Sequence, residues 1–194
     1  MEAEFSVHTT KNMVDIREDH VQKTFKNVRT GRVRFRREVE ALRRLAGVNG
    51  IPLVLDRTDA GLTLLITRLP GIDLVSCPSP PDTCFVELRS IVAEMLRRGV
   101  ARHSIPPRDV IVGPDGSAGL VDFERITLRG WRFSPVWGFA CVITRFHLLR
   151  LIGDRAPHLL TPRERLRLRL QRGFRNLFRV FINLRRRLRA KKKA

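Results

Sequence analysis

The order of the hydrophobic patterns along the chain is the feature that most restricts its fold. Short strand-type segments and one amphipathic helix come first, and mainly helical patterns follow, interrupted by a single hairpin pattern. Strands and helices that are segregated along a sequence, rather than alternating, are typical of an α+β fold. We therefore predict an α+β chain with a strand-rich first lobe and a mainly helical second lobe.

The first lobe is predicted over about residues 1–68. Residues 5–27 alternate and turn in the manner of short strands, and two further strand patterns at 51–56 and 62–67 flank a turn rich in Asp and Gly. In residues 33–46, apolar side chains recur at helical spacing with charges on the other face. This lobe should therefore be a small sheet with one helix.

The second lobe is predicted over about residues 72–160. Residues 84–98 have the apolar side of a helix, and the chain is helical again from residue 136 onward. Between them, residues 110–113 and 119–123 flank a Pro-Asp-Gly sequence, which is a strong signal for a hairpin.

Composition indicates a folded domain inside the cell. The chain has 194 residues, of which 43% are hydrophobic, so it can bury a core. Its three cysteines, Cys77, Cys84 and Cys141, lack the spacing of a disulfide framework or of a zinc site. The N-terminus has no signal-peptide core, and the longest apolar stretch, 135–143, is short for a membrane span. We expect a cytoplasmic protein, soluble or peripheral to the inner membrane.

Four segments carry chemically informative residues in a fixed order. They are a strand lysine in 21–23, helix glutamates in 36–42, a Pro-Gly turn in 65–74, and an apolar strand that ends in Asp-Phe-Glu in 119–124. With these residues in this order, the chain resembles the protein-kinase-like superfamily over roughly residues 14–160. It is most similar to small bacterial members, such as the lipopolysaccharide-core sugar kinases, and to RIO-like kinases. The resemblance implies a two-lobed protein-kinase-like fold that uses ATP and Mg²⁺.

The resemblance gives the strand lysine and the helix glutamate a joint role. Lys23 would hold the ATP phosphates, because phosphoryl transfer needs a fixed cation where negative charge accumulates. Glu38 would pair with Lys23 and orient it, and Glu40 is the alternative partner. Outside this resemblance, the same residues read as an ordinary surface lysine and a solvated helix face.

The resemblance also assigns a hinge and a metal ligand. Residues 65–74 are similar to the hinge between the lobes, where adenine binds backbone groups, so Thr67 and Leu69 would lie against the nucleotide. Asp122, in the best-matching segment, would hold the magnesium ion that bridges the phosphates. The alternative for Asp122 is a plain aspartate in the turn after a strand.

The segment that resembles the catalytic loop departs from the family pattern. Residues 100–112 have the frame of a loop that reads His-x-Asp, then four further residues, then Asn. In this frame Asp109 stands at the Asn position, where its carboxylate would still suit a metal ion, and Ser104 replaces the catalytic Asp. A serine hydroxyl is not basic at neutral pH, so it cannot accept the acceptor's proton as the Asp does. His103 is the candidate substitute base.

A second departure concerns the phosphates. No glycine precedes Gly31, so the chain lacks the glycine-rich loop whose backbone amides cradle phosphates in this family. We therefore expect a reduced affinity for ATP, or none.

Residues 161–194 are predicted to form a basic amphipathic helix. Thr161 suits the cap, Pro162 the first turn and Glu164 the positive helix end. From residue 162 to the end there are 14 Lys or Arg and one acid, within a net charge of +19 for the whole chain. Its apolar side repeats at near-heptad spacing: Leu166, Leu170, Phe174, Leu177, Phe181, Leu184 and Leu188. Residues 163–193 could lie on an anionic membrane, bind nucleic acid, or simply pack as a solvated terminal helix.

Three functional hypotheses follow. The first is a kinase-like phosphotransferase that acts on a protein or on a membrane-associated sugar or lipid. The second is a pseudokinase that uses the same fold as a scaffold at the membrane surface. The third is a basic nucleic-acid-binding protein, although the sequence shows no RNA-binding pattern with stacking aromatics. The sequence does not determine the oligomeric state.

Overall fold

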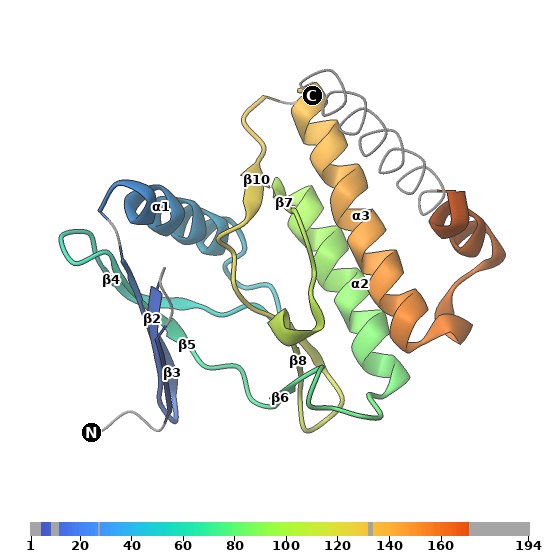
Figure 1. The fold of residues 1–194 in the computed structure, drawn as a ribbon, viewed down its shortest axis with the longest axis horizontal. Helices are drawn as coiled ribbons and strands as arrows, with labels where there is room; N and C mark the ends of the chain where they lie inside the picture. Colours follow the sequence, from blue (N-terminus) through green and yellow to red (C-terminus); the bar gives the residue numbers. More distant parts are fainter. Residues whose placement is uncertain (1–4, 9–11, 27, 132–133, 171–194) are drawn as a thin grey trace, which may run out of the picture. The chain divides into compact units, whose positions relative to one another are not determined.

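The computed structural model of the chain divides into two compact units, Met1–Leu148 and Leu149–Ala194. The ribbon is coloured in Figure 1 for the residues that the structure describes, which are 5–8, 12–26, 28–131 and 134–170. The boundary predicted at 160/161, between a kinase-like domain and a basic helix, stays a prediction.

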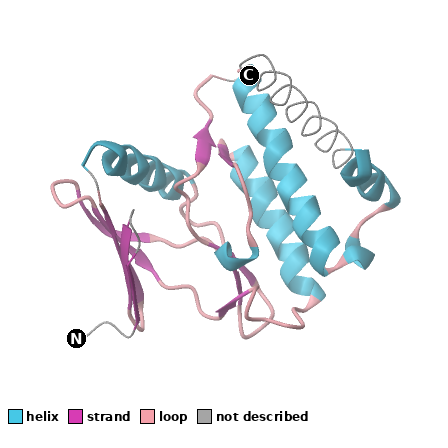
Figure 2. Ribbon diagram, viewed as in Figure 1, coloured by secondary structure: helices cyan, strands magenta, loops and turns pink. Residues whose placement is uncertain are grey.

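An antiparallel five-stranded sheet forms the first part of the Met1–Leu148 unit, in the order β1-β2-β3-β5-β4 (Figures 1 and 2). Its strands are β1 Phe5–His8, β2 Asn12–Ile16, β3 His20–Phe25, β4 Val54–Thr58 and β5 Thr63–Thr67. Strand β3 lies in the middle of this order, between β2 and β5, so a side chain on β3 can be enclosed by its neighbours. The predicted strand-rich first lobe is confirmed.

Helix α1, Val28–Arg44, buries its apolar side beside β3. The rings of Phe25 on β3 and Phe35 on α1 meet edge to face, with 5.7 Å between their centroids. The helix begins five residues before the predicted start at residue 33. The prediction placed the start late because the first turn carries no apolar periodicity. Gly31 lies in that turn, where a Cβ atom would come within 2.6 Å of the carbonyl oxygen of Lys26.

The second part of this unit is built on helix α2, Asp82–Arg97, and on two small sheets. The predicted hairpin is confirmed as β8 Val110–Val112 and β9 Ala118–Leu120, which pair antiparallel. Sequence periodicity did not show the other strands, since two or three residues are too few to establish a period: they are β6 Ile72–Asp73, β7 Val100–Arg102 and β10 Ile126–Leu128. A 3-10 turn, Pro107–Asp109, leads into β8.

Helix α3, Pro135–Arg155, confirms the helix expected from residue 136. Among the residues that the structure describes, it is the one helix long and apolar enough to cross a membrane by length and composition, with a third of its most apolar window buried (33%). The core helix of a soluble protein passes the same test of length and composition.

In the Leu149–Ala194 unit, a helix begins at Pro162 and is described to residue 170. Its start is a capping box, as the sequence predicted. The Glu164 amide donates to Thr161 Oγ1 at 3.2 Å, and the Thr161 amide donates to the Glu164 carboxylate at 2.9 Å. The remainder of the predicted basic helix lies outside the described residues.

Two glycines after α1 allow a test of how tightly the two parts of the first unit pack. Gly47 and Gly50 have φ angles of +78° and +77°. A Cβ atom on Gly47 would meet nothing within 4 Å, whereas one on Gly50 would lie 2.2 Å from the Ala118 carbonyl oxygen and 2.7 Å from Ile91 Cδ1.

We expect Gly47→Ala to lower the free energy of unfolding by roughly 1–2 kcal/mol, the cost of a left-handed backbone. Gly50→Ala should cost about 1–3 kcal/mol more, because the methyl group also collides with β9. Urea unfolding of both variants measures the difference. Equal losses would show that the close approach of Gly50 to β9 does not contribute to stability.

Candidate active site

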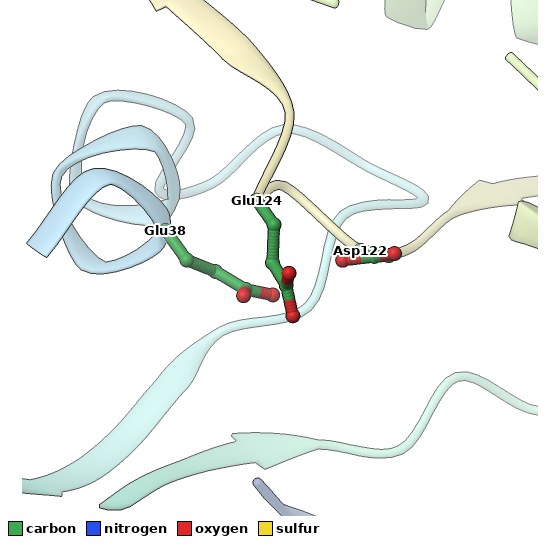
Figure 3. A group of neighbouring side chains, drawn as sticks. All are labelled: Glu38, Asp122 and Glu124. Atoms are coloured by element: carbon green, nitrogen blue, oxygen red, sulfur yellow. The ribbon is translucent and has the colours of Figure 1, made fainter. Parts of the chain in front are cut away.

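The ammonium group of Lys23 is buried on β3 and contacts three carboxylates. Its Nζ lies 2.8 Å from Glu38 Oε2, 3.0 Å from Asp122 Oδ1 and 2.9 Å from Glu124 Oε1. Figure 3 shows these three acids, which come from α1 and from the segment after β9 and converge on one point. The structure therefore brings together Lys23, Glu38 and Asp122, three of the residues predicted from the sequence.

The segment after β9 is held in place by its backbone. Asp122 has a φ of +64°, a left-handed conformation that is uncommon for a residue with a side chain. The next residue, Phe123, is fully buried, and its amide donates a hydrogen bond of 3.3 Å to Glu38 Oε1. Glu38 thus links Lys23 to the backbone beside Asp122, and it has the orienting position that the sequence suggested.

Glu40, the alternative partner of Lys23, lies elsewhere. Its carboxylate accepts hydrogen bonds from Arg43 and Arg44 on the same helix, at 2.8 and 2.7 Å. These two contacts hold the pKa of Glu40 at about 2. Since residues two apart on a helix point in different directions, burial of Glu38 leaves Glu40 nearer solvent.

Glu124 was not among the predicted site residues. Besides Lys23, it contacts Arg34 Nη1 at 3.4 Å and accepts a hydrogen bond from the side-chain amide of Asn12. Arg34 in turn donates to Asn12 Oδ1 at 2.9 Å. The only sequence signal was the glutamate in Asp-Phe-Glu, at a position where the family's pattern has glycine.

The protonation states in this cluster follow from burial and from the mutual charges. Burial alone would lower the pKa of Lys23, but the three carboxylates outweigh it and raise that pKa above its ordinary value. Burial raises the pKa of Glu38, against the opposing effect of Lys23. For Asp122, burial acts upward, yet Lys23 prevails and holds the pKa below its usual value.

A second buried cation, Arg102, holds the segment that resembles the catalytic loop. Its guanidinium pairs with the carboxylate of Asp109, and Nη1 donates to the Val121 carbonyl oxygen at 2.7 Å. It also lies 5.3 Å from the centre of the Phe123 ring. Burial raises the pKa of Asp109, and Arg102 opposes that shift. Asp109 is therefore buried and paired, so Arg102 competes with a metal ion for its oxygens.

Ser104 and His103 do not assemble a base beside this cluster. The carbonyl oxygen of Ser104 accepts a hydrogen bond from Arg102 Nε at 3.1 Å. The ring of His103 instead lies 2.9 Å from Thr127 Oγ1 on β10. Burial, Arg37 and Arg125 lower the pKa of His103, so its ring is neutral at physiological pH.

The predicted hinge residues lie at the end of β5 and just beyond it. The Thr67 amide donates a hydrogen bond to the Leu53 carbonyl oxygen at 2.9 Å, and the Leu53 amide donates one to Thr67 Oγ1 at 2.9 Å. Leu69 is half-buried and lies over β9, where a Cβ atom on Gly119 would come within 2.7 Å of its Cδ1. Leu69 thus connects the end of the first sheet to the strand that delivers Asp122.

The chemistry of the donor set suits a hard divalent cation, but Lys23 Nζ lies within 3.0 Å of all three carboxylates and takes this position in the structure. One carboxylate oxygen from each of Glu38, Asp122 and Glu124 lies within 4.8 Å of the others, and carboxylate oxygens are the ligands that Mg²⁺ prefers. The Asp122 side chain is 47% exposed and is the most accessible of the three. Asp122 is therefore more open to a metal ion than Asp109, whose side chain is 11% exposed and is paired with Arg102.

Comparison with known proteins shows the fold. No protein-family model matches the chain, and no curated protein matches it by sequence. Among solved structures, the Rio2 kinase from Chaetomium thermophilum, in an ADP/Mg²⁺-phosphoaspartate complex, has a TM-score of 0.63 at 10% identity, over 84% of this chain and 58% of that one. A crystal structure of WbdD has a TM-score of 0.56 at 18% identity, over 78% of this chain and 38% of that one.

WbdD is described as a bifunctional kinase-methyltransferase. The chain spans less than two thirds of each of these proteins. At such identities the likeness is one of fold, and the predicted protein-kinase-like α+β fold is confirmed.

The charge cluster can be tested through stability. Lys23→Met leaves Glu38 buried without its counter-ion, so we expect the free energy of unfolding at pH 8 to fall by about 3–5 kcal/mol. Adding Glu38→Gln should recover part of this loss. Lys26→Met, at an exposed position on the same segment, is the control and should change little.

The loss in Lys23→Met should also depend on pH. Burial raises the folded-state pKa of Glu38, so Glu38 binds a proton more readily in the folded than in the unfolded chain. Stability of the variant should therefore rise, and the gap to wild type narrow, as the pH falls from 8 to 5. A gap that stays constant in urea unfolding over this range would contradict the buried ion pair.

Proposed function

We propose, from this fold and from the residues gathered around Lys23, that the chain is a kinase-like phosphotransferase that uses ATP and Mg²⁺. Its acceptor would be a protein or a membrane-associated sugar or lipid. The observation that carries the proposal is the buried Lys23–Glu38 ion pair with Asp122 on the same ammonium group. The Rio2 kinase of the same fold, solved with ADP and Mg²⁺, supports the choice of ligand.

The charges of the cluster favour a nucleotide bound together with a metal ion. Three carboxylates, of Glu38, Asp122 and Glu124, face the two cations of Lys23 and Arg34, which leaves an excess of one negative charge. Nucleotide phosphates alone would be repelled by this excess. Magnesium, when bound, neutralises charge on the phosphates, and Asp122, the most accessible of the three acids, would be its protein ligand.

Lys23 supplies the fixed positive charge that phosphoryl transfer needs. Glu38 orients its ammonium group, and β2 and β5 hold the strand that carries it. Burial of Lys23 strengthens its field, because little water remains to screen it.

The segment that resembles the catalytic loop favours slow phosphate transfer. Ser104 cannot take a proton from an acceptor hydroxyl at neutral pH, and general-base catalysis is worth about 10²–10⁴ in rate. His103 is neutral, but its ring is engaged with Thr127. The pairing of Asp109 with Arg102 weakens a second potential metal ligand.

These same observations favour a second candidate, a pseudokinase scaffold. Such a protein would keep the Lys23–Glu38 pair for stability or nucleotide binding and would not turn over. The basic residues 163–193 would hold either form of the protein at an anionic membrane surface. Nucleic-acid binding remains the third candidate, and it predicts affinity that falls steeply with salt for any duplex.

Nucleotide binding is tested by unfolding the protein with and without ATP and Mg²⁺. A ligand that binds only the folded state at 100 times its Kd stabilises that state by about 2.7 kcal/mol. We expect stabilisation of the wild type, its loss in Lys23→Ala and Asp122→Ala, and its retention in Glu40→Ala. No stabilisation at millimolar nucleotide would exclude the phosphotransferase.

Turnover is tested at Ser104. If the missing base limits the rate, Ser104→Asp should raise the rate of ATP-dependent phosphate transfer or hydrolysis by about 10² or more. Ser104→Asn is the control, because asparagine has the size of aspartate but no basic group. Bound nucleotide with no turnover in either the wild type or Ser104→Asp would favour the scaffold.

A further inference from the structure

The first half of α3 and the turn before it present large apolar side chains to solvent. Trp131 is 67% exposed, Val136 67%, Phe139 68% and Val142 49%. The last three are spaced by three residues, so they lie along one side of the helix. We name these four residues the α3 surface. Exposed apolar patches on soluble proteins are often interaction sites.

The orientation of this helix is fixed by its opposite side. Ala140 and Thr144 are buried, and the Thr144 hydroxyl donates to the carbonyl oxygen of Arg102 at 2.8 Å. Because Arg102 is itself buried in the catalytic loop, α3 cannot rotate to hide its apolar side without breaking that contact. The exposure of the α3 surface is therefore a property of the folded unit.

The stretch of chain that carries the α3 surface has charges of one sign. Residues 125–153 contain five arginines and no Asp or Glu. Arg129 precedes the helix, with its guanidinium 5.8 Å from the centre of the Trp137 ring, and Arg145 is exposed one turn after Val142. Burial raises the pKa of the Cys141 thiol, and Arg145 and Arg129 both oppose that shift, which places their charges beside this part of the helix.

This combination selects one kind of partner. A second copy of the chain would bring two arginine-rich faces together, so like charges would oppose the contact. Nucleic acid would satisfy the arginines and stack on aromatic rings, but it offers nothing for Val136 and Val142. An anionic bilayer surface satisfies both, since aromatic and aliphatic side chains enter the boundary of headgroups and acyl chains while arginines bind lipid phosphates.

We propose that the α3 surface docks the protein on an anionic lipid bilayer, with Trp131 and Phe139 inserted at the interface. This helix lies on the membrane and does not cross it, because its other side packs on the catalytic loop. Docking would hold that loop near the bilayer through the Thr144–Arg102 bond, which suits a membrane-associated acceptor. The proposal does not depend on the proposed activity.

Tryptophan fluorescence reports on this docking without a label. The chain has two tryptophans, so in the full-length protein Trp137→Phe leaves Trp131 alone. On vesicles of mixed phosphatidylserine and phosphatidylcholine, we expect the emission of Trp131 to shift to shorter wavelength and to be quenched by brominated acyl chains. Vesicles of phosphatidylcholine alone should give weaker binding.

Matched variants separate this surface from other contacts. In the Trp137→Phe background, Phe139→Ser with Val142→Ser should weaken vesicle binding by at least about fivefold, because two interfacial apolar groups are lost. Val86→Ser, which removes a 55% exposed apolar side chain on α2, should leave binding unchanged. Phe139, Val142 and Val86 are exposed, so these variants should unfold at the same urea concentration as the Trp137→Phe protein.

A variant of the C-terminal basic residues distinguishes the two membrane contacts. The triple variant Arg185→Gln, Arg186→Gln and Arg187→Gln should weaken vesicle binding but leave the shift in Trp131 emission intact at saturating lipid. The proposal is overturned if the protein does not bind vesicles, if Trp131 emission is unchanged on binding, or if Phe139→Ser with Val142→Ser binds normally. If that double variant loses vesicle binding but is still stabilised by ATP, membrane docking and nucleotide binding are independent properties.

Discussion

The contacts of one buried ammonium group hold the candidate site together. Lys23 lies in the interior of the sheet, and its charge is compatible with burial only because Glu38, Asp122 and Glu124 surround it. Those acids come from two segments, α1 and the stretch after β9, so the ion pairs fix α1 against β3 and the end of β9 against both. Burial makes the arrangement all-or-none, since loss of one partner leaves an uncompensated charge.

A second buried cation, Arg102, holds together the segment that resembles the catalytic loop, and this has a chemical consequence. It neutralises Asp109, supports the backbone at Ser104 and Val121, and lies against the ring of Phe123. The loop is thereby well ordered around a residue that cannot act as a base. In the proposed kinase-like function, these interactions would occupy groups that fast phosphoryl transfer requires.

Much of the fold was predictable because periodicity is local. The central strands, α2 and the β8–β9 hairpin appear in the sequence at nearly their observed positions, since each pattern repeats within a few residues. The start of α1 was placed five residues late, and β6, β7 and β10 were missed. The short strands form by pairing with distant parts of the chain, β6 with β8 and β7 with β10, which a short window of sequence does not contain. The first turn of α1 lacks the apolar periodicity that would have marked it as helical.

The sequence by itself determined which residues the site offers: a strand lysine, a helix glutamate, an aspartate after an apolar strand, and a serine where the resemblance places the catalytic Asp. Only the tertiary structure decided that Glu38 rather than Glu40 pairs with Lys23, that Glu124 joins them, and that Arg102 engages Asp109. The reason is that a motif fixes chemistry and spacing along the chain. Burial and the approach of residues about a hundred positions apart, as between Lys23 and Asp122, arise only when the chain has packed.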